Sequence, residues 1–225
     1  EAAIRPPEYY YPRTRLVCIE NTHNRAGGRI VPFEVHRRLF FLCRANEIAV
    51  HLDGARIWHA HVETGVPLGE YGRYADTVSV CFSKGLGAPV GSMLLGTHAH
   101  ILRARKIRKT LGGAMRQAGI LAAAAEYALR VNLPRLAEDH AKARRFAAAL
   151  ADRRSFSLDV SQVETNMVLL HFPGKERARS AVSRLADRGI GTGLISPSVL
   201  RVVFHGDIPA EALDEIIGIF TELFD

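Results

Sequence analysis

The sequence has no apolar run long enough to cross a membrane. About 18–20 consecutive apolar residues are needed to span a bilayer, and the 225 residues contain no such run. The opening stretch carries Arg5, Arg13 and Arg15 among prolines and tyrosines, where a secretory signal would have an apolar core. We therefore expect a cytoplasmic protein without a membrane partner.

Cysteine is scarce. The three cysteines, Cys18, Cys43 and Cys81, are odd in number and widely spaced, and they lie in or beside apolar runs. This pattern predicts reduced core thiols rather than a disulfide scaffold, again in a cytosolic compartment. The chain does not lack hydrophobic residues, which make up 48% of it beside 24% charged residues. That balance excludes a disordered or collagen-like chain.

Several common site motifs are missing. The sequence has no G-x-x-x-x-G-K-[ST], no G-x-S-x-G and no H-E-x-x-H. Gly85–Gly91 has one residue too many for G-x-G-x-x-G, and Pro89 lies where a helix should open, so a Rossmann site is not expected. His51 and Asp53 share a face of a predicted strand, but no further ligand accompanies them, and we expect no metal.

A nucleic-acid partner is not expected either, although the net charge is +7. Five positive charges lie together in Arg103–Lys109, on a predicted helix. No aromatic platform or nucleic-acid motif accompanies them, so a solvated helix face is the better interpretation.

The pattern of apolar runs predicts an α/β fold. Short apolar stretches ending in turn-rich segments alternate with helical segments, which is typical of a mostly parallel sheet. The expected strands are Thr14–Glu20, Ile48–Leu52, Asp76–Phe82 and Gly91–Leu95, and the first expected helix is Phe33–Asn46.

The second half begins with helices. Residues 98–150 have a helical pattern that Gly112–Gly113 and Asn132–Pro134 divide into three helices. After Arg154 the α/β pattern returns. The expected strands are Asn166–Phe172 and Leu200–Phe204, and the expected helices are Lys175–Arg188 and Pro209–Phe224. We predict a large domain over 1–130, a connecting helix over 131–154 and a small C-terminal α/β domain over 155–225.

Polar residues follow three consecutive strands at the edge where ligands bind in open α/β sheets. The end of the first strand gives Glu20–Asn24. Asp53 follows the second strand, with Arg56 close behind, and Lys84 follows the third strand among glycines. An amine and a carboxylate so placed suit pyridoxal phosphate (PLP), because the amine bonds to the aldehyde and the carboxylate keeps the pyridine nitrogen protonated. From spacing alone, an ordinary ion pair between domains explains Asp53 and Lys84 equally well.

Six segments together resemble one family. The chain is similar over nearly its whole length to the low-specificity threonine aldolases, fold-type I PLP lyases grouped with the β-eliminating lyases. The matching segments are ENTHN (20–24) with Gly27–Gly28, HLDGARI (51–57), SKGLGAPVGS (83–92), GGAMRQ (112–117), TNM (165–167) and RVVFH (201–205).

The resemblance implies a fold-type I sheet, PLP as cofactor and a role for each matched residue. Lys84 corresponds to the lysine that holds PLP covalently, and Asp53 to the carboxylate paired with the pyridine nitrogen. Arg116 corresponds to a contact to the cofactor phosphate that comes from a neighbouring subunit, which implies a homo-oligomer, either a dimer or a tetramer.

The substrate-binding residues implied are Arg56 and Arg201, which match the two arginines that bind the substrate carboxylate, and Lys109, a basic residue near the site. The implied reaction is cleavage of threonine or allo-threonine to glycine and acetaldehyde. The alternatives are another PLP-dependent β-eliminating lyase, or an inactive truncated relic that acts only as an interaction module.

The chain departs from the family at its start. Family members usually begin upstream, with a loop that cradles the phosphate and a histidine stacked on the cofactor, so we expect this chain to lack the N-terminal portion. Where many members carry a histidine, this sequence has Tyr10. Tyr10 and His23 are candidates for the catalytic base, but a solvated tyrosine has a pKa of ~10, and we expect an upstream residue or water to act instead.

Overall fold

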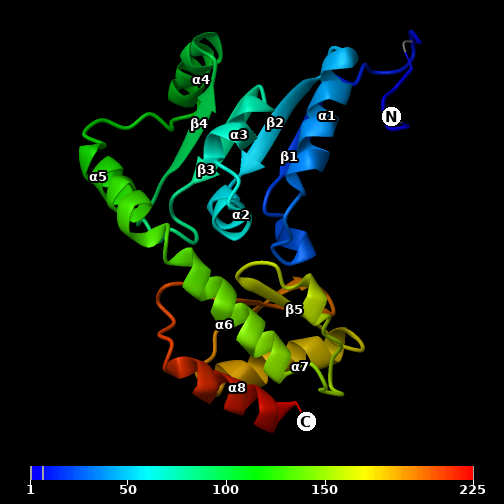
Figure 1. The fold of residues 1–225 in the computed structure, drawn as a ribbon, viewed down its shortest axis with the longest axis vertical. Helices are drawn as coiled ribbons and strands as arrows, with labels where there is room; N and C mark the ends of the chain where they lie inside the picture. Colours follow the sequence, from blue (N-terminus) through cyan, green and yellow to red (C-terminus); the bar gives the residue numbers. More distant parts are fainter. Residues whose placement is uncertain (1, 7, 225) are drawn as a thin grey trace. The chain divides into compact units, whose positions relative to one another are not determined.

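The computed structural model describes residues 2–6 and 8–224. The chain divides into two compact units, each with its own sheet (Figure 1). The first unit contains Glu1–Thr22 and Val31–Arg130, and the second contains His23–Ile30 and Val131–Asp225. A short segment near the start of the chain therefore folds with the C-terminal half.

The first unit is built on a four-stranded sheet in the order β1-β2-β3-β4. Strands β1, β2 and β3 are parallel, and β4 runs antiparallel to β3. All four expected strands are present, with ends shifted by at most two residues: β1 (Leu16–Glu20), β2 (Ala49–Gly54), β3 (Thr77–Cys81) and β4 (Ser92–Gly96).

Three helices follow the first two strands: α1 (Phe33–Ala45), α2 (Ile57–Thr64) and α3 (Leu68–Arg73). Helix α1 packs beside α3, where the Phe33 ring meets Tyr71 edge-on at 5.5 Å. On the sheet, Leu52 and Val80 are buried, whereas the alternate residues Asp53 and Ser79 are only half-buried. Because successive side chains of a strand point to opposite faces, the sheet has one apolar face, with Leu52 and Val80, and one polar face, with Asp53 and Ser79.

Helices α2 and α3 were not predicted. They are 8 and 6 residues long, and neither begins with a side-chain cap hydrogen bond. Short helices without a Ser, Thr, Asp or Asn cap carry little sequence signal. Packing holds them in place, since Tyr71 is almost completely buried.

The helical stretch after β4 breaks at the predicted glycines. Helices α4 (His98–Thr110) and α5 (Gly119–Tyr127) have no buried residue. The basic face of α4 is thus solvated, as expected. A π-helical turn, η2 (Ala128–Asn132), links α5 to the second unit.

The second unit packs three helices against an antiparallel sheet in the order β5-β7-β6. Its core contains the fully buried rings of Phe146, Phe204 and Phe220, and Phe146 meets the other two at 5.4 and 4.8 Å. The short β6 was not predicted. The elements are α6 (Leu136–Ala149), β5 (Met167–His171), α7 (Lys175–Ala186), β6 (Gly193–Ser196), β7 (Val199–Val203) and α8 (Ala212–Leu223).

The cysteines are free thiols, but only one is in a core. Cys43 is buried, Cys81 is half-buried and Cys18 is exposed. The prediction of three core thiols was therefore wrong for Cys18, which lies on the edge strand β1 and pairs with His51 on the polar face of the sheet. Among the described residues, no helix is long and apolar enough to cross a membrane.

Candidate active site

Asp53 lies near the carboxyl end of β2, with a strand on each side. It is in register with Glu20 of β1 and Ser79 of β3. Its Oδ1 accepts a hydrogen bond from the backbone N–H of Ala55 at 3.1 Å, which fixes the half-buried carboxylate at the strand end. A Cβ on Gly54 would lie 3.0 Å from the Ser79 carbonyl oxygen, so glycine is needed for the strands to approach here.

Lys84 lies in a tight turn after β3, and it is exposed. The Lys84 carbonyl accepts from the N–H of Gly87 at 2.8 Å, and the Phe82 carbonyl accepts from Ala88 at 2.9 Å. The indole of Trp58 donates to the Cys81 carbonyl at 2.8 Å and stacks on Phe82. The backbone around Lys84 is thus fixed while its amine extends into solvent.

The other predicted site residues are less closely grouped. Arg56 is the half-buried residue directly before α2, two residues after the end of β2, so it lies at the same end of β2 as Asp53. Lys109 is in the last turn of α4, and Arg116 lies between α4 and α5; both are exposed. Asp53 and Arg56 thus lie at the same end of β2, Lys84 follows the adjacent strand β3, and Lys109 and Arg116 come later in the chain of that unit.

Arg201 lies in the second unit, on β7, and is half-buried. Its Nη1 donates a hydrogen bond to Oδ1 of Asn24, in the short 3-10 helix η1 (Asn24–Ala26). Sequence reasoning had given Asn24 no role. Its only signal was its place among the polar residues that follow the first strand.

The two candidate bases are both engaged elsewhere. Tyr10 is 62% exposed and packs against Tyr9 and Tyr11, with ring centroids 5.1 and 4.7 Å away. Nδ1 of His23 accepts the backbone N–H of Ala26 at 3.1 Å, which caps η1. Neither contact supports a role as base.

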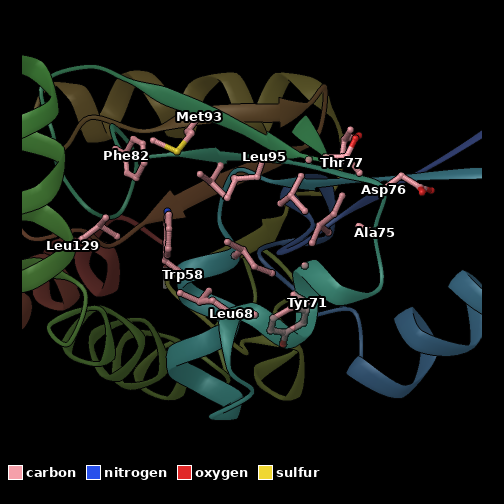
Figure 2. Close-up of a pocket in the computed structure, with 18 residues that line it drawn as sticks. Trp58, Leu68, Tyr71, Ala75, Asp76, Thr77, Phe82, Met93, Leu95 and Leu129 are labelled. Carbon is pink, nitrogen blue, oxygen red and sulfur yellow. The ribbon is translucent and has the colours of Figure 1, made fainter. Parts of the chain in front are cut away.

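An apolar cavity of about 700 Å³ lies against the apolar face of the first sheet. Figure 2 shows its wall of Trp58, Phe82, Met93 and Leu95. The acidic group at its rim, Asp76, is already hydrogen-bonded to the N–H of Val50 and to Arg44. The cavity therefore offers shape and apolar surface, while Asp53 lies on the opposite face of the sheet from Leu52, which lines the cavity.

Burial shifts the pKa of groups away from this region. It lowers the pKa of His36 and raises the pKa values of Cys43 and Tyr71. In the described part of the chain, no cluster of three or more His, Cys, Asp or Glu side chains is arranged to hold a metal ion.

Comparison with known proteins identifies the family. The sequence profile of the beta-eliminating lyases matches residues 1–173. The chain belongs to the beta-eliminating lyase family. It is 40% identical to low-specificity L-threonine aldolase 1 of Arabidopsis thaliana over 226 residues, covering 99% of this chain and 63% of the relative. It is 41% identical to the low specificity L-threonine aldolase of Escherichia coli over 214 residues, covering 95% of this chain and 61% of the relative.

Solved structures show the same fold for this beta-eliminating lyase. A threonine aldolase of Leishmania major superposes with a TM-score of 0.75 at 17% identity, covering 93% of this chain and 61% of that one. Serine palmitoyltransferase of Sphingomonas wittichii superposes with a TM-score of 0.72 at 18% identity, covering 95% of this chain and 56% of that one. The fold is that of the fold-type I PLP enzymes, and the resemblance to threonine aldolases is confirmed. The chain spans about three-fifths of the length of the relatives.

The residues present suit PLP, the cofactor of these enzymes. Lys84 offers a solvent-accessible primary amine for the aldehyde, and Asp53 offers an anchored carboxylate for the pyridine nitrogen. The exposed guanidinium of Arg116 suits a phosphate. This donor set matches the three chemical functions of the cofactor.

Proposed function

We propose that this chain carries out the carbon–carbon bond cleavage of a threonine aldolase, converting threonine or allo-threonine to glycine and acetaldehyde. The observation that carries the proposal is the placement of Asp53 and Lys84 at the carboxyl ends of two neighbouring parallel strands, in a chain 40% identical to a low-specificity L-threonine aldolase. We take residues 1–130 as the main part of the cofactor-binding domain and 155–225 as the small domain, joined through 131–154.

Bound PLP supplies an aldehyde that condenses with the substrate amine and a protonated ring that accepts electrons from the breaking bond. Asp53 holds the proton at the pyridine nitrogen, for which its fixed carboxylate is suited. Lys84 would hold the cofactor through its amine. Water would take the β-hydroxyl proton, and cleavage of the Cα–Cβ bond would release acetaldehyde while Cα takes up a proton to give glycine.

The substrate carboxylate is assigned to Arg56 and Arg201, because a guanidinium forms two parallel hydrogen bonds with a carboxylate. We place Lys109 near the same substrate and Arg116 on the cofactor phosphate. The three free cysteines support our further proposal of a cytoplasmic enzyme. The match of Arg116 to a phosphate contact that comes from a neighbouring subunit supports assembly as a homo-oligomer.

The test compares Lys84→Ala with Lys175→Ala, a change at an exposed lysine at the start of α7. The full chain is loaded with PLP, and glycine formation from threonine and the visible absorbance of bound cofactor are measured. We expect Lys84→Ala to lose both signals and Lys175→Ala to keep both. Cofactor absorbance without threonine cleavage, but with turnover of another β-substituted amino acid, would identify a different lyase. An inert wild-type chain without absorbance would refute the proposal.

A further inference from the structure

Several arginines of the second unit form ion pairs with carboxylates. Arg29 pairs with the Glu164 carboxylate at 3.1 Å, and Arg188 pairs with Glu222 at 2.7 Å. Arg201 instead donates to the neutral amide oxygen of Asn24. Among the described residues of its own unit, no carboxylate forms an ion pair with Arg201. Its partner thus orients the guanidinium without neutralising its charge.

Two residues of the neighbouring strands lie directly opposite Arg201, and neither has a polar side chain. In the sheet, Arg201 is in register with Leu169 on β5 and Gly193 on β6, an apolar side chain and a residue with none. A long arginine side chain between such neighbours has several rotamers of similar energy. The hydrogen bond that Arg201 donates to Asn24 is therefore what selects the orientation of the guanidinium.

Asn24 is itself held in place by the segment around it. Its carbonyl accepts the N–H of Gly27 at 3.1 Å, and the Gly28 carbonyl accepts the hydroxyl of Thr165 at 2.7 Å. The N–H of Ile30 donates to the Glu164 carboxylate at 2.6 Å. These bonds attach residues 23–30 to the start of β5 and keep Asn24 opposite β7.

We infer that Asn24 is a positioning residue: its amide holds the Arg201 guanidinium in the orientation that receives the substrate carboxylate and leaves the full positive charge available. This inference rests on the proposed function, which assigns a carboxylate to Arg201. A carboxylate at position 24 would hold the same geometry but compete with the substrate for the charge, so a neutral residue is required there.

The experiment compares Asn24→Ala, Asn24→Asp and the control Arg25→Ala, an exposed neighbour on the same helix. The side-chain N–H signals of Arg201 are followed by NMR in the full chain, assigned by their loss in Arg201→Lys. Acetate, a simple carboxylate, is titrated in without cofactor, and KM and kcat for threonine are measured with PLP.

We expect wild type to show slow rotation of the Arg201 guanidinium, and Asn24→Ala to show fast rotation. Acetate binding and KM should weaken roughly tenfold in Asn24→Ala, about the effect of one hydrogen bond to a charged group, while kcat and cofactor absorbance stay near wild type. Asn24→Asp should restore slow rotation yet bind acetate more weakly than Asn24→Ala. Arg25→Ala should match wild type.

The outcomes separate the two proposals. Acetate affinity that is equal in wild type, Asn24→Ala and Asn24→Asp, or no acetate binding at Arg201 in wild type, would overturn the positioning role. Threonine turnover that is absent while acetate binding follows the expected order would instead reject the proposed reaction and keep the role of Asn24. A purely structural role for Asn24 would let aspartate replace it without loss of acetate affinity.

Discussion

Gly28→Ala should destabilise the second unit by more than its backbone conformation alone explains. Gly28 has a φ of +78°, where an L-residue costs ~1–2 kcal/mol. An added Cβ would also lie 2.5 Å from the Thr165 hydroxyl oxygen, too close to be tolerated. Moving that hydroxyl breaks its bond to the Gly28 carbonyl, and an unsatisfied buried group costs about 1–3 kcal/mol. The total expected loss is about 2–5 kcal/mol.

Gly189→Ala is the matched control. Gly189 belongs to the same unit and has a φ of +77°, but a Cβ there would meet nothing within 4 Å. It should lose only the conformational part, ~1–2 kcal/mol. The difference between the two variants therefore measures the clash and the lost hydrogen bond.

The assay is urea unfolding followed by far-UV circular dichroism, with Trp58 fluorescence as a separate report on the first unit, which holds the chain's single tryptophan. Adding Thr165→Ala to Gly28→Ala removes the clash, so the double variant should lose at least ~1 kcal/mol less than the sum of the single losses. Equal losses in Gly28→Ala and Gly189→Ala would refute the reasoning.

Two further predictions concern buried ionisable groups. Burial lowers the pKa of His36 below 6.5, and its Nδ1 has no hydrogen-bond partner, so the unfolded state binds the proton more tightly. The free energy of unfolding should thus fall as the pH drops below 6.5, by up to about 1.4 kcal/mol per pH unit. His36→Gln should flatten this slope in urea titrations between pH 7 and 5. An unchanged slope would contradict the assignment of the pH dependence to His36. The Asp139 carboxylate is 3% exposed and lies 2.8 Å from the Lys142 amine. Lys142→Met should cost about 3–5 kcal/mol of unfolding free energy in the same assay, because it leaves that buried carboxylate unpaired. A loss below ~1 kcal/mol, typical of exposed pairs, would show that solvent screens the pair.

Much of the fold could be predicted because local and tertiary preferences agree. The strands β1 to β4 are short apolar runs between turn segments, and helices α1 and α4 follow a clear helical period. Helices α2 and α3 could not be found in this way, because packing against the sheet, rather than capping or length, makes them helical. Strand β6 begins at Gly193 and has mostly exposed residues, so it lacks the apolar signal of a strand.

The site was predictable where chain order dictates position. Asp53 and Lys84 each follow an apolar strand, and parallel neighbours bring such residues to one edge. The contact between Asn24 and Arg201 joins residues 177 positions apart, and it depends on residues 23–30 folding with β5. No local pattern signals that excursion, since the glycines that permit it, Gly27 and Gly28, are also typical of an ordinary turn.

Partial burial together with a neutral hydrogen-bond partner distinguishes Arg201 from the exposed cations of this chain. Water solvates exposed groups such as Lys109 and Arg116 at little cost, so a missing carboxylate partner indicates nothing about them. Arg201 is half-buried between an apolar side chain and a glycine, and desolvating a charge is unfavourable unless hydrogen bonds or an opposite charge compensate it. A neutral amide compensates only part of this cost. A carboxylate bound at the guanidinium would supply the missing negative charge, which is why this arginine suits a binding role better than a structural one.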